Sequence, residues 1–230
     1  MEYLEYERIL SAKRMQRYKD AADGDTRKAM ALYRYNLRLS QEMFTIVSCF
    51  EVALRNAIDS LLVPSLGGNW LKDSVQDNGI FSNGRMNETR KIIEKAYTRL
   101  NRQGIYSHSK LIAEMEFGVW KYMYSSLQYR ATGQCLLRAF PNKPRSSAAV
   151  QYNNAYIFNE LDKVNSLRNR IAHHEPICFR LHASEIDTSY IVNEYQKIQT
   201  LFSWMGIDSR SMLYGLDHVQ SVCSKINALK

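Results

Sequence analysis

The sequence has few of the features that mark secreted or disulfide-stabilised proteins. Only four of its 230 residues are cysteine, and only four are proline. The cysteines are far apart and form no Cys-x-x-Cys pair, which favours reduced thiols in a cytosolic chain over a disulfide framework. They are Cys49, Cys135, Cys178 and Cys223.

A membrane-spanning segment is also missing from the pattern. The longest apolar stretch, residues 43–62, contains four interrupting polar residues, namely Glu51, Arg55, Asn56 and Asp59. A spanning helix needs about 20 predominantly apolar residues, so this stretch does not qualify. The first eight residues are acidic and polar, where a signal peptide would be basic and then apolar. We therefore expect a cytoplasmic protein without a membrane partner.

The charge is moderately basic. Lys and Arg number 31 against 23 Asp and Glu, a formal net charge of +8 at pH 7, and 45% of the residues are hydrophobic. The apolar content is sufficient for one full core and excludes a disordered chain. A basic surface is compatible with a polyanionic partner, although net charge says nothing about the fold.

Helical periodicity runs through the chain, and no segment alternates as a strand would. The pattern predicts one all-α domain over residues 1–230, a helical bundle of roughly seven to nine helices, without repeats or an internal boundary. Trp70 and Phe81 should anchor a long loop at 64–84, and 141–147 should be a basic loop. The helices are expected at 7–20, 26–39, 41–63, 86–103, 109–126, 127–139, 148–174, 187–205 and 211–228.

The most informative segment is residues 165–176, Asn-Ser-Leu-Arg-Asn-Arg-Ile-Ala-His-His-Glu-Pro. On a helical wheel, Arg168 falls inside the apolar stripe of this helix. A charged guanidinium on an apolar face is costly unless it is paired or used. Pro176 disfavours helical geometry at Glu175. The stripe consists of Ile157, Leu161, Val164 and Ile171.

Three polar residues follow the flank of the same face at steps of four: Asn165, Asn169 and His173. We expect Asn169 to hydrogen-bond the ring of His173 and to fix its orientation. Arg168 and His173 are five residues apart and diverge by roughly 140° on a regular helix. They can serve one phosphate if the Arg side chain swings round, if the helix end frays, or if a second protomer completes the site. We favour the second protomer.

These residue types suit the cleavage of RNA. A histidine near neutral pH can take a proton from a 2′-hydroxyl or give one to the leaving oxygen. An arginine binds phosphate with its planar fork and stabilises charge developing on it. Because the 2′-hydroxyl of RNA supplies the nucleophile, the reaction needs no metal, and we predict no cofactor.

Structural roles remain open for each of these residues. Arg168 could pair with Glu51, which lies on the shoulder of the core face of the helix at 41–63. Glu51, Arg55 and Asp59 could equally form an i, i+4 ladder. His173, His174, Cys178 and His182 have a spacing that matches no structural zinc site. Of the fifteen tyrosines, some could stack bases, but most are expected to pack.

A basic line at Arg27, Arg34 and Arg38 is expected to be a solvated helix face that could contact an RNA backbone. The segment Glu114-Met-Glu-Phe-Gly-Val-Trp120 places Met115, Phe117 and Val119 at positions expected in the core.

Three stretches, in this order and separation, make the chain similar to the Abi-like family of bacterial abortive-infection proteins, of the AbiD/AbiF type, within the HEPN superfamily. Residues 50–56 resemble the family's early Glu-x-x-x-Arg helix, and residues 114–120 resemble its Glu-x-x-Phe-Gly-x-Trp element. Residues 167–176 contain the Arg-polar-x3-His pattern of the superfamily. The resemblance covers about residues 7–205, and residues 206–230 form a C-terminal helical extension outside it.

The resemblance implies a HEPN-like up-and-down bundle, usually dimeric, with the motifs of both protomers facing a shared cleft. It implies a metal-independent endoribonuclease of the toxin or phage-defence type, with RNA as substrate and an antitoxin or another regulatory protein as a further partner. Arg168 and His173 would be the catalytic pair, and Asn169 the polar residue beside the Arg. Supporting positions are His174, Glu51, Arg55 and Asn165, and weaker RNA contacts are Arg27, Arg34, Arg38 and Arg170.

Two alternatives remain. Some HEPN domains only bind nucleic acid, a nucleotide or a protein partner, so the chain could be a catalytically inactive module of a phage-defence or toxin–antitoxin system. It could also be a purely structural dimerisation domain, which would have no affinity for nucleic acid even at low salt.

Overall fold

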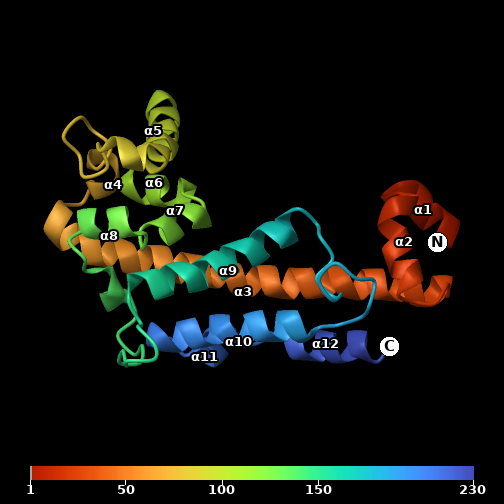
Figure 1. The fold of residues 1–230 in the computed structure, drawn as a ribbon. Helices are drawn as coiled ribbons and strands as arrows, with labels where there is room; N and C mark the ends of the chain where they lie inside the picture. Colours follow the sequence, from red (N-terminus) through yellow and green to blue (C-terminus); the bar gives the residue numbers. More distant parts are fainter. Residues whose placement is uncertain (1) are drawn as a thin grey trace. The chain divides into compact units, whose positions relative to one another are not determined.

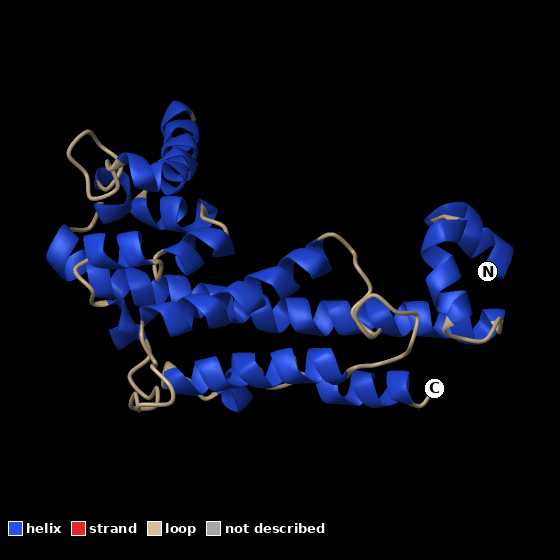
Figure 2. Cartoon of the chain, viewed as in Figure 1, coloured by secondary structure: helices blue, strands red, loops and turns tan. Residues whose placement is uncertain are grey.

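A computed structural model describes residues 2–230 of the chain, and within them every regular element is helical (Figures 1 and 2). The predicted all-α class is confirmed. An isolated bridge between Phe179 and Ile186 is the one pairing of β type in this part of the chain. The elements are α1 (Tyr3–Leu10), α2 (Ala12–Asp20), α3 (Thr26–Leu66), α4 (Trp70–Asp73), η1 (Gly84–Met86), α5 (Asn87–Arg102), α6 (His108–Glu114), α7 (Phe117–Tyr122), α8 (Ser126–Ala131), η2 (Leu136–Ala139), α9 (Asn154–Ala172), α10 (Ser189–Trp204), α11 (Ser209–Met212) and α12 (Val219–Asn227).

The twelve α-helices of the described residues exceed the predicted seven to nine because several predicted helices are divided. Ser11 separates α1 from α2 with φ 77°, and its hydroxyl accepts a hydrogen bond from Arg14 N to cap α2. Met115 is extended and ends α6 before α7 begins. These breaks depend on single residues whose types do not mark an interruption.

The opposite difference occurs in α3, one helix of 41 residues where two were predicted. Leu39 and Met43 are both buried on either side of Ser40, so the apolar face continues through it. Pro64 lies in the last turn, where its missing N–H removes only one hydrogen bond from the helix.

The chain forms two compact units that alternate along the sequence. The first consists of residues 1–48, 166–200 and 208–230, and the second of residues 49–165 and 201–207. The core of the first unit includes Tyr18, which is fully buried and packs its ring against Tyr33 and Phe179 at centroid distances of 5.2 and 5.1 Å.

In the second unit, Trp70 and Phe81 are buried anchors of the segment after α3, as predicted. Trp70 Nε1 donates to Asp59 Oδ1 at 2.7 Å, and the ring of His108 contacts the same oxygen at 2.7 Å. Gly79 permits a tight turn here, because a Cβ on it would lie 2.3 Å from the carbonyl oxygen of Ser74.

Phe50 packs against Phe202 and Phe117, with ring centroids 5.3 and 6.3 Å apart, inside the second unit. Residues 114–120 lie largely in the core of this unit, since Met115, Phe117 and Val119 are at most 3% exposed. This confirms the prediction from sequence. Among residues 2–230, no helix combines the length and the apolar character needed to cross a membrane.

Candidate functional site

The motif helix α9 ends at Ala172, and the residues that follow form a defined cap. Glu175 N donates to Arg170 O at 2.9 Å, and His174 N donates to Ile171 O at 3.0 Å. These two bonds, with His174 at φ 56°, form the Schellman arrangement that closes many helices. The helix therefore stops two residues before the predicted end, and His173 is the last residue before the chain reverses.

Side chains from elsewhere in the first unit fix the backbone at this cap. Arg14 of α2 donates from Nη1 to the carbonyl oxygen of His174 at 2.9 Å. Arg170 donates to Pro176 O at 3.0 Å, pairs with Glu175 at 3.3 Å and lies over the ring of Tyr190 at 5.0 Å. Since its donors and its face are engaged in this way, Arg170 shapes the cap and is poorly placed for the RNA contact that was predicted.

Arg168 lies on the face of α9 that carries the buried Ile157 and Leu161, in agreement with the helical wheel. Leu167 and Ile171 occupy the buried positions, whereas Arg168 is half-buried. Its Nη1 donates to Asn169 Oδ1 over a long 3.4 Å. The ion pairs found among the described residues of this unit use other cations. Within the described residues of this unit, the guanidinium therefore has no carboxylate partner.

The two histidines that follow are both exposed, as is Asn169. The Asn169 side chain accepts from Arg168 and makes no hydrogen bond to the His173 ring within the described residues, in contrast to the expectation from sequence. The link between Asn169 and His173 is the backbone bond from His173 N to Asn169 O at 2.9 Å. Asn169 is therefore placed to orient the arginine.

Together, the end of α9 presents an exposed imidazole, a half-buried guanidinium, and a neutral amide beside it. An imidazole can accept and return a proton near neutral pH. A guanidinium can bind the non-bridging oxygens of a phosphate. This combination suits proton transfer and charge stabilisation at a phosphodiester.

Three predicted supporting residues belong to the second unit: Glu51 and Arg55 of α3, and Asn165 of α9. All three are half-buried. Arg55 Nε is buried without a hydrogen-bond partner among the described residues. A buried donor that lacks a partner costs free energy, so Arg55 is the least favourably placed of these three side chains.

The predicted basic line on α3 is only partly available. Arg27 is exposed, but Arg34 donates to the hydroxyl of Tyr6 at 2.9 Å and lies over its ring at 5.5 Å. Arg38 forms an ion pair with the buried carboxylate of Glu42 at 2.7 Å.

Sequence reasoning missed Glu42 and the arginines of α2. Glu42 is 3% exposed and also accepts from His218 N at 3.0 Å. Arg17 of α2 bonds the carbonyl oxygens of Ala183 and Arg180 and lies 4.7 Å from the ring centre of Phe179. A possible signal for Glu42 was its i, i+4 spacing from Arg38. The contacts of α2 join residues some 160 positions apart, for which the sequence carries no local signal.

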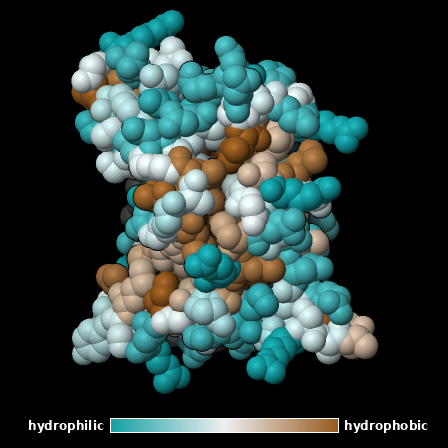
Figure 3. Space-filling model, turned by 90° about the vertical axis from the view of Figure 1, so that its left-hand side faces the viewer, coloured by the Kyte–Doolittle hydropathy of each residue, from teal (hydrophilic) through white to brown (hydrophobic). Residues whose placement is uncertain are grey.

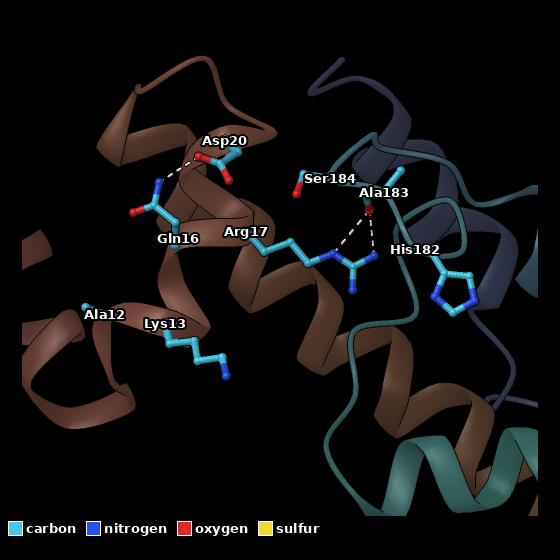
Figure 4. A pocket seen from close by; sticks show the side chains of 8 residues that line it. All are labelled: Ala12, Lys13, Gln16, Arg17, Asp20, His182, Ala183 and Ser184. Carbon is cyan, nitrogen blue, oxygen red and sulfur yellow. Dashed lines mark hydrogen bonds between the residues drawn. The ribbon is translucent and has the colours of Figure 1, made fainter.

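Arg17 also lines a shallow pocket of about 550 Å³ between α2 and residues 182–184 (Figure 4). The side chain points across the pocket to the Ala183 carbonyl, while His182 lies beyond it. Gln16 and Asp20 bond one another at 2.6 Å on the opposite wall. Because Arg17 donates to the carbonyl oxygens of Ala183 and Arg180, it stabilises the segment after the motif and is already engaged in this pocket.

A larger groove of about 1280 Å³ lies along α5 in the second unit, bounded by residues of α6, α7 and α8. Some of its charges are paired, as in Lys91 with Glu88 and Arg99 with Glu114. Exposed apolar residues such as Ile92 contribute to its lining. Figure 3 shows brown, apolar atoms reaching the surface between polar ones.

Within residues 2–230, no three His, Cys, Asp or Glu side chains gather in a way that could hold a metal ion. Cys178, two residues after the motif, is buried, and burial raises the pKa of its thiol to about 12. A thiol in this state is a poor nucleophile and a poor metal ligand at neutral pH.

Comparison with known proteins adds one finding. A family described as "Abi-like protein" matches the chain over residues 2–178. No curated protein and no solved structure gives a significant match. The match covers α1 to α9 and ends at the buried Cys178, so it includes the whole motif and its cap.

Proposed function

The chain belongs to the Abi-like family, a membership that indicates a function in abortive infection, and we propose that it acts as a metal-independent endoribonuclease. The reaction takes place at the end of α9. The chain thus disables RNA, in the host or in an invading phage, with Arg168, Asn169 and His173 as its reactive group.

In this proposal, His173 removes the proton from a ribose 2′-hydroxyl. The 2′-oxygen then attacks the adjacent phosphorus, the bond from phosphorus to the 5′-oxygen breaks, and a protonated imidazole gives its proton to that leaving oxygen. The products are a 2′,3′-cyclic phosphate and a 5′-hydroxyl. Arg168 stabilises the negative charge that develops on the non-bridging oxygens. Asn169 holds the guanidinium through its side-chain oxygen.

One observation carries the proposal: the end of α9 exposes a histidine five residues beyond a half-buried arginine, and the side-chain hydrogen bond of that arginine is to a neutral amide. A structural arginine on this helix would resemble Arg170, whose guanidinium is held by a carboxylate, a carbonyl oxygen and an aromatic ring. The contrast between two arginines that are two residues apart favours a ligand-binding role for Arg168.

The same geometry supports a homodimer of HEPN type as part of the proposal. Arg168 lies on the body of the helix, whereas His173 lies in its cap, where the chain reverses. A second protomer that brings its own motif to the same phosphate would supply a second imidazole, so that one accepts a proton while the other donates one.

The test is RNA cleavage by the purified protein in EDTA. We expect wild type to cut, and Arg168→Ala and His173→Ala to lose at least about 100-fold of the rate, the scale of general acid–base catalysis. His182→Ala and Arg8→Ala are matched controls, since they remove an exposed histidine and an exposed arginine outside the motif. Melting temperatures of all variants should lie close to that of wild type.

Equal cleavage by wild type and both motif variants would reject the proposal. RNA binding without cleavage, unaffected by either substitution, would favour the catalytically inactive module instead.

A further inference from the structure

A long part of the second unit carries no carboxylate. Between Glu116 and Glu160 the sequence contains no Asp or Glu, but it contains five cations. A segment of this length without acids contributes no charge that repels phosphate, and the nearby carboxylate of Glu160 is paired with Lys163. The cations are Lys121, Arg130, Arg138, Lys143 and Arg145.

Three aromatic rings cluster at the end of this segment. Tyr152 lies 4.8 Å from Tyr156 and 5.6 Å from Trp204, measured between ring centres. Tyr156 and Trp204 are 6.0 Å apart. All three side chains are half-buried, so each ring retains some contact with solvent. In a closed core such rings would be fully covered, as those of Trp70 and Trp120 are.

Hydrogen bonds hold the loop that presents these rings. Asn142 donates from its backbone N to Trp204 O at 2.9 Å and from Nδ2 to Ser203 O at 3.3 Å, which ties the loop to the end of α10 (Figure 1). Tyr152 N donates to Ser146 Oγ at 3.0 Å. Tyr156 N donates to Asn153 Oδ1 at 3.0 Å in the first turn of α9. The cluster is therefore a preformed surface.

The cations of the loop are available. Arg138 and Arg145 are exposed and Lys143 is half-buried. The ion pairs found among the described residues of this unit include none of these three. Lys121 differs, because it is 6% exposed and pairs with Asp162 at 2.7 Å. Lys143 and Arg145 lie on the same loop that carries Tyr152, whereas Arg138 lies in η2 just before it.

We propose that Tyr152, Tyr156 and Trp204 form a stacking platform for the bases of single-stranded RNA, with Lys143 and Arg145 contacting its backbone. Every base has a π-face, so stacking on aromatic rings beside a basic loop binds single strands with little sequence preference. An apolar protein partner would not require uncompensated cations, and a duplex hides its base faces. The inference rests on the proposed ribonuclease function, for which the platform is a substrate-binding site separate from Arg168 and His173.

Trp204 provides a direct readout. Trp70 and Trp120 are 1% and 0% exposed, so Trp204 is the tryptophan of the chain that a ligand can reach. A base stacked on it should quench the intrinsic fluorescence. The probe is a 2′-O-methyl oligouridine of twelve nucleotides, which cannot be cut because its 2′-oxygen is blocked.

We expect saturable quenching in wild type, and a dissociation constant raised on the order of tenfold by Trp204→Ala or Tyr152→Ala, measured by anisotropy of a labelled probe. Trp204→Phe keeps a ring and should retain most of the affinity. Tyr97→Ala is the matched control, since Tyr97 is half-buried and pairs edge-to-face with Tyr106 at 5.2 Å in the same unit.

The charges are tested with two double variants of equal net charge. Lys143→Gln/Arg145→Gln should lower the slope of log affinity against log salt by about 1.4, because each single-strand phosphate that a cation neutralises contributes about 0.7 to that slope. Lys95→Gln/Arg102→Gln, which removes two exposed cations of α5, should leave the slope unchanged.

The inference is overturned if saturating RNA does not quench Trp204, or if Tyr97→Ala weakens binding as much as Tyr152→Ala. A preference for an RNA duplex over the single strand would also overturn it. These results are independent of cleavage. A protein that cuts RNA without quenching loses only the platform, and one that quenches without cutting loses only the nuclease proposal.

Discussion

The two ends of α9 differ in what they expose. Its first turn, in the second unit, is lined by Tyr152 and Tyr156, with Trp204 packed against both. Its last turn, in the first unit, presents Arg168 and His173, followed by a backbone held by Arg14. The first turn offers flat, neutral rings, whereas the last turn offers titratable and charged groups.

This difference separates binding from chemistry. Stacking needs ring faces and tolerates any base, so it adds affinity without selecting a reaction. Proton transfer and charge stabilisation act on the transition state and raise the rate of the chemical step. In the proposed function, substrate affinity thus depends on one end of this helix and catalysis on the other, so substitutions at the two ends should affect different kinetic constants.

The largest expected effect is on the rate of the chemical step. In single-turnover cleavage of an RNA oligonucleotide, Arg168→Ala should lower the maximal rate by at least about 100-fold and leave the RNA concentration at half-maximal rate nearly unchanged. Trp204→Ala should raise that concentration on the order of tenfold and leave the maximal rate nearly unchanged. If both variants change the same constant, the separation of roles is wrong.

A smaller effect is expected from loosening the backbone at the last turn. Arg14→Ala removes the hydrogen bond from a charged donor to the His174 carbonyl, and we expect a loss of about 1.5 kcal/mol in the free energy of unfolding. Lys13→Ala, one residue away on the same helix, should change it little. Urea denaturation gives both values. An Arg14 variant as stable as wild type would show that the cap holds without this bond.

Replacing His174 with glycine is expected to increase stability by a smaller amount. Its φ of 56° lies in the left-handed region, which costs an L-residue roughly 1 kcal/mol and costs glycine almost nothing. After the entropy that glycine loses on folding, His174→Gly should stabilise the protein by about 0.5 kcal/mol relative to His174→Ala. Cleavage should persist in both. Loss of cleavage in His174→Gly would move the acid–base role from His173 to His174.

The smallest effect concerns the first turn of α9 at high pH. Burial, followed by the charge of Glu160, raises the pKa of Tyr156 above its ordinary value of 10.0. A raised pKa in the folded state contributes stability that is present below pH 10 and lost as the pH rises further. Tyr156→Phe should therefore flatten the decline of melting temperature above pH 10, whereas Arg168→Ala should not. An unchanged decline in Tyr156→Phe would show that this tyrosine is already ionised equally in both states.

The helical class and much of the core could be predicted from the sequence because apolar residues recur with the period of a helix. Ile157, Leu161 and Val164 are buried as expected, and Trp70 and Phe81 anchor their loop. Local signals failed where one residue controls the backbone. Ser11 has a positive φ and divides a helix that was predicted to be continuous. Conversely, α3 continues through Ser40, where the sequence predicted a boundary between two helices.

The candidate site was only partly predictable for a different reason. The spacing of Arg168 and His173 and the place of Arg168 on the apolar face are visible in the sequence, but the burial of Leu167 beside it was not predicted. The contact of Arg14 with the His174 carbonyl joins residues 160 positions apart. Such contacts arise from tertiary packing, which no local periodicity records, and the aromatic cluster with Trp204 arises in the same way.

The most direct test of the central claim is the chemistry of the cut ends. RNA incubated with the protein in EDTA should yield fragments with a 2′,3′-cyclic phosphate and a 5′-hydroxyl, and a substrate with 2′-deoxyribose throughout should stay intact. Mass spectrometry of the products distinguishes these termini from others. Fragments with a 5′-phosphate and a 3′-hydroxyl, or cleavage of the deoxy substrate, would contradict attack by the 2′-oxygen and with it the roles of His173 and Arg168.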